Sequence, residues 1–273
     1  MVCLGKGVPS SETLLSVKGA SKSFGGLKAL SDVSVAIASG EIYGLIGPNG
    51  AGKTSFFNVI TGLYQPDSGH FELAGKSYSP QSIHGVVEAG IARTFQNIRL
   101  FPEMTVLENV MVGRHCRTRG LHAGVIGAIF RTSGFRAMER GIRDHALGLL
   151  NYVGLAERSS TMACTLSYGD QRRLEIARAL ATEPVLLALD EPAAGMNATE
   201  KNSLRELLKR IRDDGKTILI IEHDVKLVMG LCDRVTVLDY GCVIATGLPQ
   251  QVRHDPAVIE AYLGRAAAHE AQP

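Results

Sequence analysis

The sequence predicts an α/β protein with a central, largely parallel β-sheet covered by helices on both faces. Three observations predict this class. Short apolar runs alternate with segments of helical period in the first and last thirds of the chain. A glycine-rich segment, 47–54, lies between one such run and a helical segment, and the run 185–189 is apolar throughout. Continuous apolar runs of this length are typical of strands buried on both faces of a parallel sheet.

The first third of the chain contains several strands and one helix. Val33, Val35 and Ile37 alternate with small or polar residues, which is the period of a half-buried strand. The turn residues 38–41 separate this strand from the next apolar run. The expected elements are strands at Leu14–Val17, Val33–Ile37, Ile42–Ile46 and His70–Leu73, and a helix at Ser55–Leu63.

The middle third differs in composition, and the last third returns to alternating elements. From Asn97 to about Cys164 the β-branched runs disappear, and helices are expected at Leu107–Arg114 and Gly141–Val153. We therefore predict a mostly helical insertion between two α/β segments. In the last third, the pattern predicts helices at Asp170–Ala181, Thr199–Arg212, Val225–Leu231 and His254–Leu263, and strands at Val185–Leu189, Lys216–Ile221 and Arg234–Asp239.

Composition excludes several classes of protein. The 273 residues are 45% hydrophobic and 21% charged, with a formal net charge of +2, which excludes a disordered chain and gives no electrostatic reason to expect nucleic acid. No apolar run approaches the roughly 18 to 20 residues that span a bilayer. Residues 1–10 do not have the pattern of a secretory signal. We expect a cytosolic chain with no membrane segment of its own.

The segment after the strand Ile42–Ile46 fits the pattern G-x-x-x-x-G-K-[ST]. Its glycines allow successive backbone N–H groups to face inward at the start of a helix, which forms a cradle for phosphate. The lysine would reach the outer phosphates, and the following hydroxyl would serve Mg²⁺. The alternative is a glycine-rich turn with an accidental Lys-Thr pair. The residues are Gly47, Pro48, Asn49, Gly50, Ala51, Gly52, Lys53 and Thr54.

Two carboxylates follow the apolar strand Val185–Leu189. Asp190 at the carboxyl edge of such a strand would lie beside a phosphate loop, where it can hold the water shell of a metal ion. Glu191 would then orient or deprotonate an attacking water molecule. The alternative is an acidic surface turn.

A second anion site is expected at a helix start more than a hundred residues beyond the first. Ser167 and Gly169 open the helix that includes Asp170–Ala181, so free backbone N–H groups and the positive end of the helix dipole face outward there. The same residues could equally form a helix cap with Ser167 at the N-cap position.

These three elements together resemble the ATP-binding cassette ATPases, which are P-loop NTPases. The resemblance covers about Leu14 to Leu263 and identifies Gly47–Thr54 as Walker A, Val185–Asp190 as Walker B, and 166–170 as the signature. It implies an N-terminal antiparallel β subdomain and a helical subdomain at about 97–165, within an ATPase domain of 12–264. Residues 1–11 and 265–273 are expected to be tails.

The resemblance also implies roles for single residues. Phe24 would stack on the adenine of ATP, and Ser55 would join the phosphate loop in binding it. Gln96 matches the Q-loop and His223 the switch histidine, and both would sense the γ-phosphate while Glu191 acts as the base. The residues implied for Mg²⁺ are Thr54, Gln96 and Asp190, and Ser167 and Gly169 would cover the γ-phosphate held by a second copy.

Within this family, the sequence is similar to the ATP-binding subunits of high-affinity branched-chain amino acid importers. The strings that carry this similarity include 93–96, 168–180 and 221–224. The similarity implies membrane-spanning permease subunits, a second ATPase subunit and, indirectly, a solute-binding protein as partners. The chain would work at the cytoplasmic face of the inner membrane. The alternatives are an importer of urea or short amides, a soluble cassette ATPase without a transport role, and a nucleotide-binding regulator that does not hydrolyse ATP.

Overall fold

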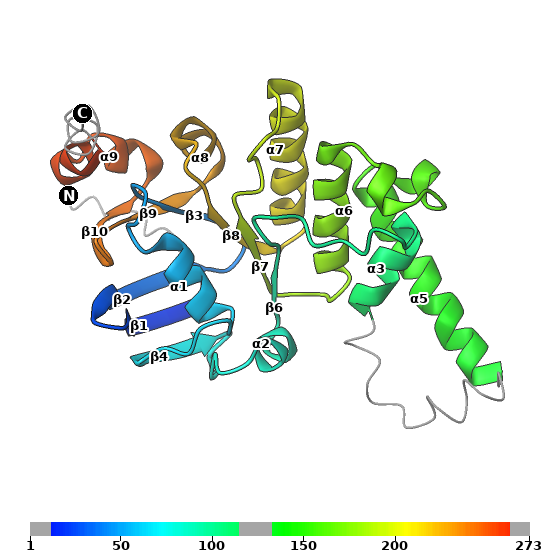
Figure 1. Ribbon diagram of the computed structural model, residues 1–273, viewed down its shortest axis with the longest axis horizontal. Helices are drawn as coiled ribbons and strands as arrows, with labels where there is room; N and C mark the ends of the chain where they lie inside the picture. The colour runs from blue at the N-terminus through cyan, green and yellow to red at the C-terminus, as the bar shows by residue number, and fades with distance from the viewer. Residues whose placement is uncertain (1–11, 115–132, 263–273) are drawn as a thin grey trace, which may run out of the picture.

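The computed structural model describes residues 12–114 and 133–262, which form two sheets and a group of helices (Figure 1). An antiparallel sheet lies at one end of the molecule and the helices α3, α5 and α6 at the other, with a mostly parallel sheet between them. The predicted tails, 1–11 and 265–273, lie outside the described residues, as does 115–132 of the predicted helical insertion. The boundaries of that insertion remain a prediction.

The antiparallel sheet has the order β2-β1-β4-β5. Its main feature is a long hairpin whose strands run well beyond the two short strands expected from sequence. Gly25 and Gly26 form the turn with positive φ angles of 52° and 92°, which is the conformation that a tight two-residue hairpin needs. The strands are β1 (Thr13–Phe24), β2 (Leu27–Ala38), β4 (Ser68–Leu73) and β5 (Lys76–Ser77).

The second sheet has the order β10-β9-β3-β8-β7-β6, and all its neighbouring strands are parallel except the pair β9–β10. The predicted fold class is therefore confirmed. The edge strands β6 and β10 were not predicted, because each is short or only partly buried and so lacks a long apolar run. The strands are β3 (Ile42–Ile46), β6 (Ile91–Arg93), β7 (Leu186–Asp190), β8 (Thr217–Ile221), β9 (Arg234–Asp239) and β10 (Cys242–Gly247).

Helices cover the second sheet and extend to one side of it. α3 and α5 pack against each other and α3 packs against α6, which joins this helical group to the sheet (Figure 1). The sequence did not predict α2 and α9. The helix predicted at His254–Leu263 is observed over residues 256–262. The helices are α1 (Lys53–Ile60), α2 (Ile83–Ala89), α3 (Val106–Arg114), α5 (Ser133–Tyr152), α6 (Tyr168–Leu180), α7 (Ala198–Asp213), α8 (Val225–Leu231) and α9 (Pro249–Arg253).

The central strands separate two hydrophobic cores. On β8, Ile218 and Ile220 belong to the core shared with α6 and α7, whereas Leu219 and Ile221 belong to the core shared with α1 and the antiparallel sheet. β3 and β7 divide their residues in the same way. Because both faces of these strands exclude water, every residue of each strand is buried, which explains their continuous apolar sequences.

Parallel pairing places the carboxyl ends of β3, β8, β7 and β6 along one edge of the sheet. The segments that leave these four strands start with residue 47, residue 222, residue 191 and residue 94. Loops at this edge form the usual ligand site of open α/β sheets. The order of the strands therefore brings four distant stretches of sequence to one place.

Candidate active site

The phosphate loop leaves β3 and leads directly into α1. Lys53 is buried, and its Nζ donates hydrogen bonds to the carbonyl oxygens of Gly47 (2.7 Å) and Pro48 (3.0 Å). These bonds hold the ammonium group of Lys53 against the start of the phosphate loop. The first turn of α1 offers N–H groups that have no partner within the helix, so the loop and helix together suit an anion.

The three glycines of the loop have different surroundings. A Cβ on Gly47 would overlap the carbonyl oxygen of Leu238, and one on Gly52 would lie 2.6 Å from the carbonyl oxygen of Ala29. Both glycines therefore allow the loop to pack closely against neighbouring backbone. Gly50 also has a positive φ, of 75°, but a Cβ there would meet no protein atom within 4 Å. Gly50 thus presents its backbone to open space.

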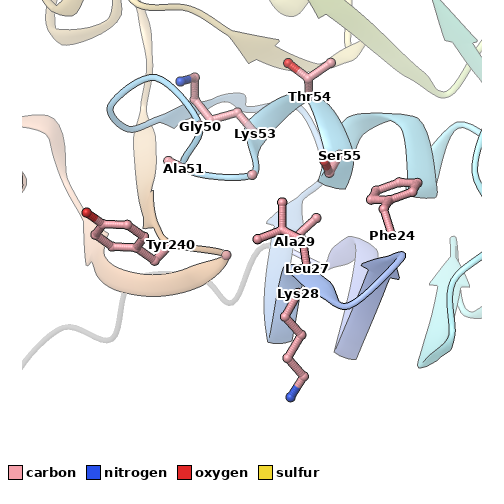
Figure 2. A pocket seen from close by; sticks show the side chains of 12 residues that line it. Phe24, Leu27, Lys28, Ala29, Gly50, Ala51, Lys53, Thr54, Ser55 and Tyr240 are labelled. Atoms are coloured by element: carbon pink, nitrogen blue, oxygen red, sulfur yellow. The ribbon is translucent and has the colours of Figure 1, made fainter.

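A cavity of about 350 Å³ lies along this loop and the start of α1 (Figure 2). Phe24, at the end of β1, borders it beside Ser55, and Tyr240, in the turn between β9 and β10, borders it at the other end. The Phe24 ring is 41% exposed and is held edge-on by Tyr64, with 5.1 Å between ring centroids. The other predicted binding residues that line the cavity are Gly50, Ala51, Gly52, Lys53 and Thr54, whereas Gly47, Pro48 and Asn49 are not among its lining residues.

Asp190 ends β7 as a buried carboxylate. Burial is the main reason that the pKa of Asp190 is raised, and the nearby charge of Glu191 adds to the effect. Arg93 Nη2 lies 3.9 Å from Asp190 Oδ2 and opposes the shift. Thr94 Oγ1 accepts a hydrogen bond from the Asp190 N–H over 3.4 Å. The strand end is therefore anchored by β6, while its charge is only partly compensated.

Two predicted residues converge on the carboxylate of a third. Gln96 Nε2 donates a hydrogen bond to Glu191 Oε2 over 2.9 Å, and His223 Nδ1 lies 3.5 Å from the same oxygen. Glu191 has a φ of 45°, unusual for a residue other than glycine, and its N–H donates to the Ile221 carbonyl oxygen. Such backbone conformations cost about 1–3 kcal/mol and concentrate at functional sites. The three side chains come from the ends of three strands.

A second buried carboxylate, Glu222, supports this group. Glu222 precedes His223, and its Oε1 accepts a hydrogen bond from the Ala193 N–H over 2.9 Å. Burial raises the pKa of Glu222, and the charge of Glu191 raises it further. The bond joins the turn after Glu191 to the end of β8. Sequence reasoning assigned no role to Glu222, although its position between a buried strand and His223 was a usable signal.

The signature residues form a helix start away from the cavity. Ser167 is the N-cap of α6, and its side chain accepts a hydrogen bond from the Asp170 N–H over 3.3 Å. A Cβ on Gly169 would lie 2.8 Å from Glu200 Oε1, so α7 packs closely against this turn. Neither Ser167 nor Gly169 lines the phosphate-loop cavity. Both the helix-cap interpretation and a binding role for a second molecule are compatible with this placement.

The donor set suits Mg²⁺ only together with phosphate. Within residues 12–114 and 133–262, no group of three or more His, Cys, Asp and Glu side chains could hold a metal ion by itself. The predicted ligands are a hydroxyl (Thr54), an amide (Gln96) and a carboxylate (Asp190), and oxygen ligands of this kind suit Mg²⁺, which is usually bound by one or two protein oxygens plus substrate phosphates. The buried and only partly compensated charge of Asp190 also favours a nearby cation.

The structure adds site residues that the sequence did not indicate. Tyr240 lines the cavity. Arg93 connects β6 to α1 below the site, because it donates hydrogen bonds to Asn58 Oδ1 (3.1 Å) and Thr61 Oγ1 (2.7 Å). Arg93 also lies against the ring of Phe57. Arginines and tyrosines are common at surfaces, so nothing local in the sequence separates these two from the others.

A strand, a glycine-rich loop that encloses a buried lysine, and carboxylates at the end of a parallel strand two places away in the same sheet define the class: the protein is a P-loop ATPase. The chain belongs to the ABC transporter family, whose model matches residues 30–194. A second family model, described as branched-chain amino acid ATP-binding cassette transporter, matches residues 242–268. The resemblance identified from the motifs is confirmed.

Individual relatives agree with this assignment. The chain is 46% identical over 257 residues to the high-affinity branched-chain amino acid transport ATP-binding protein LivG of Escherichia coli (strain K12), covering 94% of this chain and all of LivG. It is similar to the ADP conformation of an ATP-binding cassette of an ABC transporter (TM-score 0.80, 32% identity, 92% of this chain and 99% of that one). It is also similar to a dimeric cassette in a post-hydrolysis state with ADP and Pi (TM-score 0.71, 26% identity, 86% and 99%).

Across the part of the chain that the structure describes, none of the helices has both the length and the apolar character needed to cross a membrane.

Proposed function

We propose that this chain is the ATP-hydrolysing subunit of an importer for branched-chain amino acids. Two similarities support the solute: the family model that matches residues 242–268, and the 46% identity to LivG over the whole length of LivG. The ATPase residues touch no solute, so the solute follows from this similarity alone. The chain acts at the cytoplasmic face of the membrane.

ATP binds along the phosphate-loop cavity. Lys53 turns toward the outer phosphates, the N–H groups of 50–55 bind phosphate oxygens, and Phe24 stacks on the adenine. Gly47, Pro48 and Asn49 form the part of the phosphate loop that does not line the cavity, and the carbonyl oxygens of Gly47 and Pro48 hold Lys53 in place. Thr54, Gln96 and Asp190 are the residues that would hold Mg²⁺. When bound, the ion would supply positive charge against the charge that develops on the phosphate oxygens.

Glu191 acts as the general base for the attacking water molecule. Its carboxylate already accepts a hydrogen bond from Gln96 and lies beside His223, so both neighbours fix its orientation. Gln96 and His223 also contact the γ-phosphate. When that phosphate is bound, the two side chains are fixed, and they hold the Glu191 carboxylate in one position. A base fixed in this way contributes through both proton transfer and orientation.

Two cassettes cooperate at a shared interface. Ser167 and Gly169 lie outside the phosphate-loop cavity of their own chain, so a second copy or a similar ATPase subunit provides the phosphate that they cover. The relative with ADP and Pi is a dimer. The remaining partners are permease subunits, which bind the cassettes, and a solute-binding protein that acts through the permease.

The test has two stages. Replacement of the base, Glu191→Gln, is expected to keep ATP binding, to stabilise a dimer with ATP, and to lower turnover to a small fraction of the parent. ATPase activity near that of the parent would overturn the assignment of Glu191. The transporter is then purified with its membrane subunits, reconstituted into vesicles, and assayed for uptake of leucine and of urea. Uptake of leucine supports the proposal, and uptake of urea without leucine overturns the proposed solute.

A further inference from the structure

A fully buried ion pair lies on α6, just after the signature residues. Arg172 Nη1 and Glu175 Oε2 are 2.9 Å apart, and each side chain is only 1% exposed. They occupy positions i and i+3 of the helix that Ser167 caps. Neither residue lines the phosphate-loop cavity, and neither was assigned a role above.

Both members of the pair bind the backbone around Gln96. Arg172 donates hydrogen bonds to the carbonyl oxygens of Phe95 (2.5 Å) and of Gln96 itself. Glu175 Oε1 accepts hydrogen bonds from the N–H groups of Phe95 (3.3 Å) and Arg99 (3.5 Å). Within the described part of the chain, residues 95–99 make no backbone–backbone hydrogen bonds to a strand or helix, because β6 ends at Arg93. The ion pair therefore determines where the Gln96 backbone lies.

Stability alone is a weak reason to bury this pair. Removing two charges from water costs several kcal/mol per ion, and well-packed apolar residues often replace a buried ion pair without loss of stability. Within the described residues, Arg172 Nε is also buried without a hydrogen-bond partner, which adds to the cost. Apolar residues at these two positions could not donate or accept hydrogen bonds, so they could not hold the backbone of residues 95–99 as the guanidinium and the carboxylate do.

We infer that Arg172 and Glu175 are positioning residues that set Gln96 against Glu191 and link it to the signature end of α6. The inference rests on the proposed roles of Gln96 and Glu191. Through this clamp, defined as Arg172, Glu175 and the backbone of 95–99, a displacement of α6 moves Gln96. Contact of the signature residues with the γ-phosphate of a second cassette is thereby communicated to the water-activating group of the same chain.

The test compares variants of the full chain, measured for ATPase kinetics, ATP binding and thermal unfolding. We expect Arg172→Gln to lower kcat by about tenfold or more and to change KM for ATP by less than about threefold, because Arg172 does not line the phosphate-loop cavity. Arg172→Lys keeps one charged donor and is expected to restore part of kcat. The matched control is Arg173→Gln, since Arg173 lies on the same helix, pairs with Asp170 and, among the described residues, forms no hydrogen bond or ion pair with residues 95–99.

A double variant, Arg172→Gln with Gln96→Ala, distinguishes an effect that passes through Gln96 from a general loss of structure. If Arg172 acts through Gln96, the double variant has the same kcat as Gln96→Ala alone. If the two losses multiply, or if Arg172→Gln behaves like Arg173→Gln, the inference is wrong. Should Arg172→Gln unfold, Glu175→Gln gives the same comparison, because it removes the charge and retains the side-chain shape. Activity in Glu191→Gln would instead contradict the proposed function, independently of the clamp.

Discussion

The side-chain amide of Gln96 donates a hydrogen bond to Glu191 Oε2 over 2.9 Å, although 95 residues separate the two in sequence. Gln96 follows β6 and Glu191 follows β7, and these strands are parallel neighbours. The bond therefore depends on strand pairing, and it joins the residue that leads toward the helical group to the proposed base. Because two further residues, His223 and Glu222, reach the same region from β8, small changes here are expected to affect turnover.

Replacement of Gln96 tests this relationship. We expect Gln96→Ala to lower kcat by about 100-fold, which is the usual effect of losing one preorganised hydrogen-bond donor. Gln96→Glu is expected to be more damaging near neutral pH, because a second carboxylate beside Glu191 disfavours its charged form. The activity of this variant should recover toward higher pH. Steady-state kinetics from pH 6 to pH 9 would show this, and identical profiles for the two variants would contradict it.

Two glycines of the phosphate loop are expected to differ in their roles: Gly47 contributes mainly to folding stability, and Gly50 mainly to ATP binding. Gly47→Ala forces a Cβ into the Leu238 carbonyl oxygen and should destabilise the fold by about 2–5 kcal/mol. Gly50→Ala meets no protein atom, so it should cost only about 1–2 kcal/mol of left-handed strain while it weakens ATP binding by tenfold or more, about 1.4 kcal/mol. Urea unfolding and calorimetric titration with ATP measure the two effects.

Gly40→Ala is the matched control for Gly50→Ala. Gly40 also has a φ of 75° and no atom within 4 Å of an added Cβ, but it does not line the cavity. It should lose similar stability and bind ATP like the parent. Equal loss of ATP affinity in both variants would show that backbone strain, and not contact with phosphate, is responsible.

Phe24 is expected to contribute to nucleotide affinity and little to stability. Its ring borders the cavity and is already oriented by the edge of Tyr64. Stacking of a base on an aromatic ring contributes about 1–3 kcal/mol, so Phe24→Ala should weaken ATP binding by roughly 5- to 150-fold. Phe24→Tyr retains the ring and should bind like the parent. Calorimetric titration of both variants measures this, and unchanged affinity in Phe24→Ala would remove the residue from the site.

The buried carboxyl of Glu222 is expected to reduce stability as pH rises. Burial raises the pKa of Glu222 above its usual 4.5, so above pH 4.5 the folded protein holds this proton more tightly than the unfolded chain. The free energy of unfolding therefore falls as pH rises through the folded pKa. Glu222→Gln removes this loss and can still accept the Ala193 N–H. Its advantage over the parent should grow as pH rises from 4, below the usual pKa of a glutamate, to 8 in urea unfolding experiments.

Glu206→Gln serves as the control for that series. Glu206 lies exposed on α7 and pairs with Lys209 on the surface, where an ion pair contributes little. Its effect on unfolding should be small and the same at every pH. If Glu222→Gln differed from the parent by a constant amount across this range, the raised pKa of Glu222 would be contradicted.

Much of the fold and of the candidate site could be read from local patterns. Buried strands have continuous apolar sequences because both of their faces are covered, so β3, β7 and β8 were predicted close to their observed bounds. The phosphate loop was equally visible, because strand, glycines, lysine and helix are consecutive. By contrast, the long hairpin of β1 and β2 is underestimated from sequence, since its outer residues mix polar and apolar side chains without a clear alternation and gain their order from pairing with each other.

By itself, the sequence determined the chemistry that this protein can perform: a phosphate loop, a strand that ends in two carboxylates, and a histidine after another strand. Only the tertiary structure decided how these groups act together. Parallel strand order brings Gln96 and His223 to the Glu191 carboxylate, and the buried pair Arg172–Glu175 places the Gln96 backbone. The physical reason is that motifs depend on neighbouring residues in the chain, whereas hydrogen bonds across a sheet or between layers depend on packing of segments far apart in sequence.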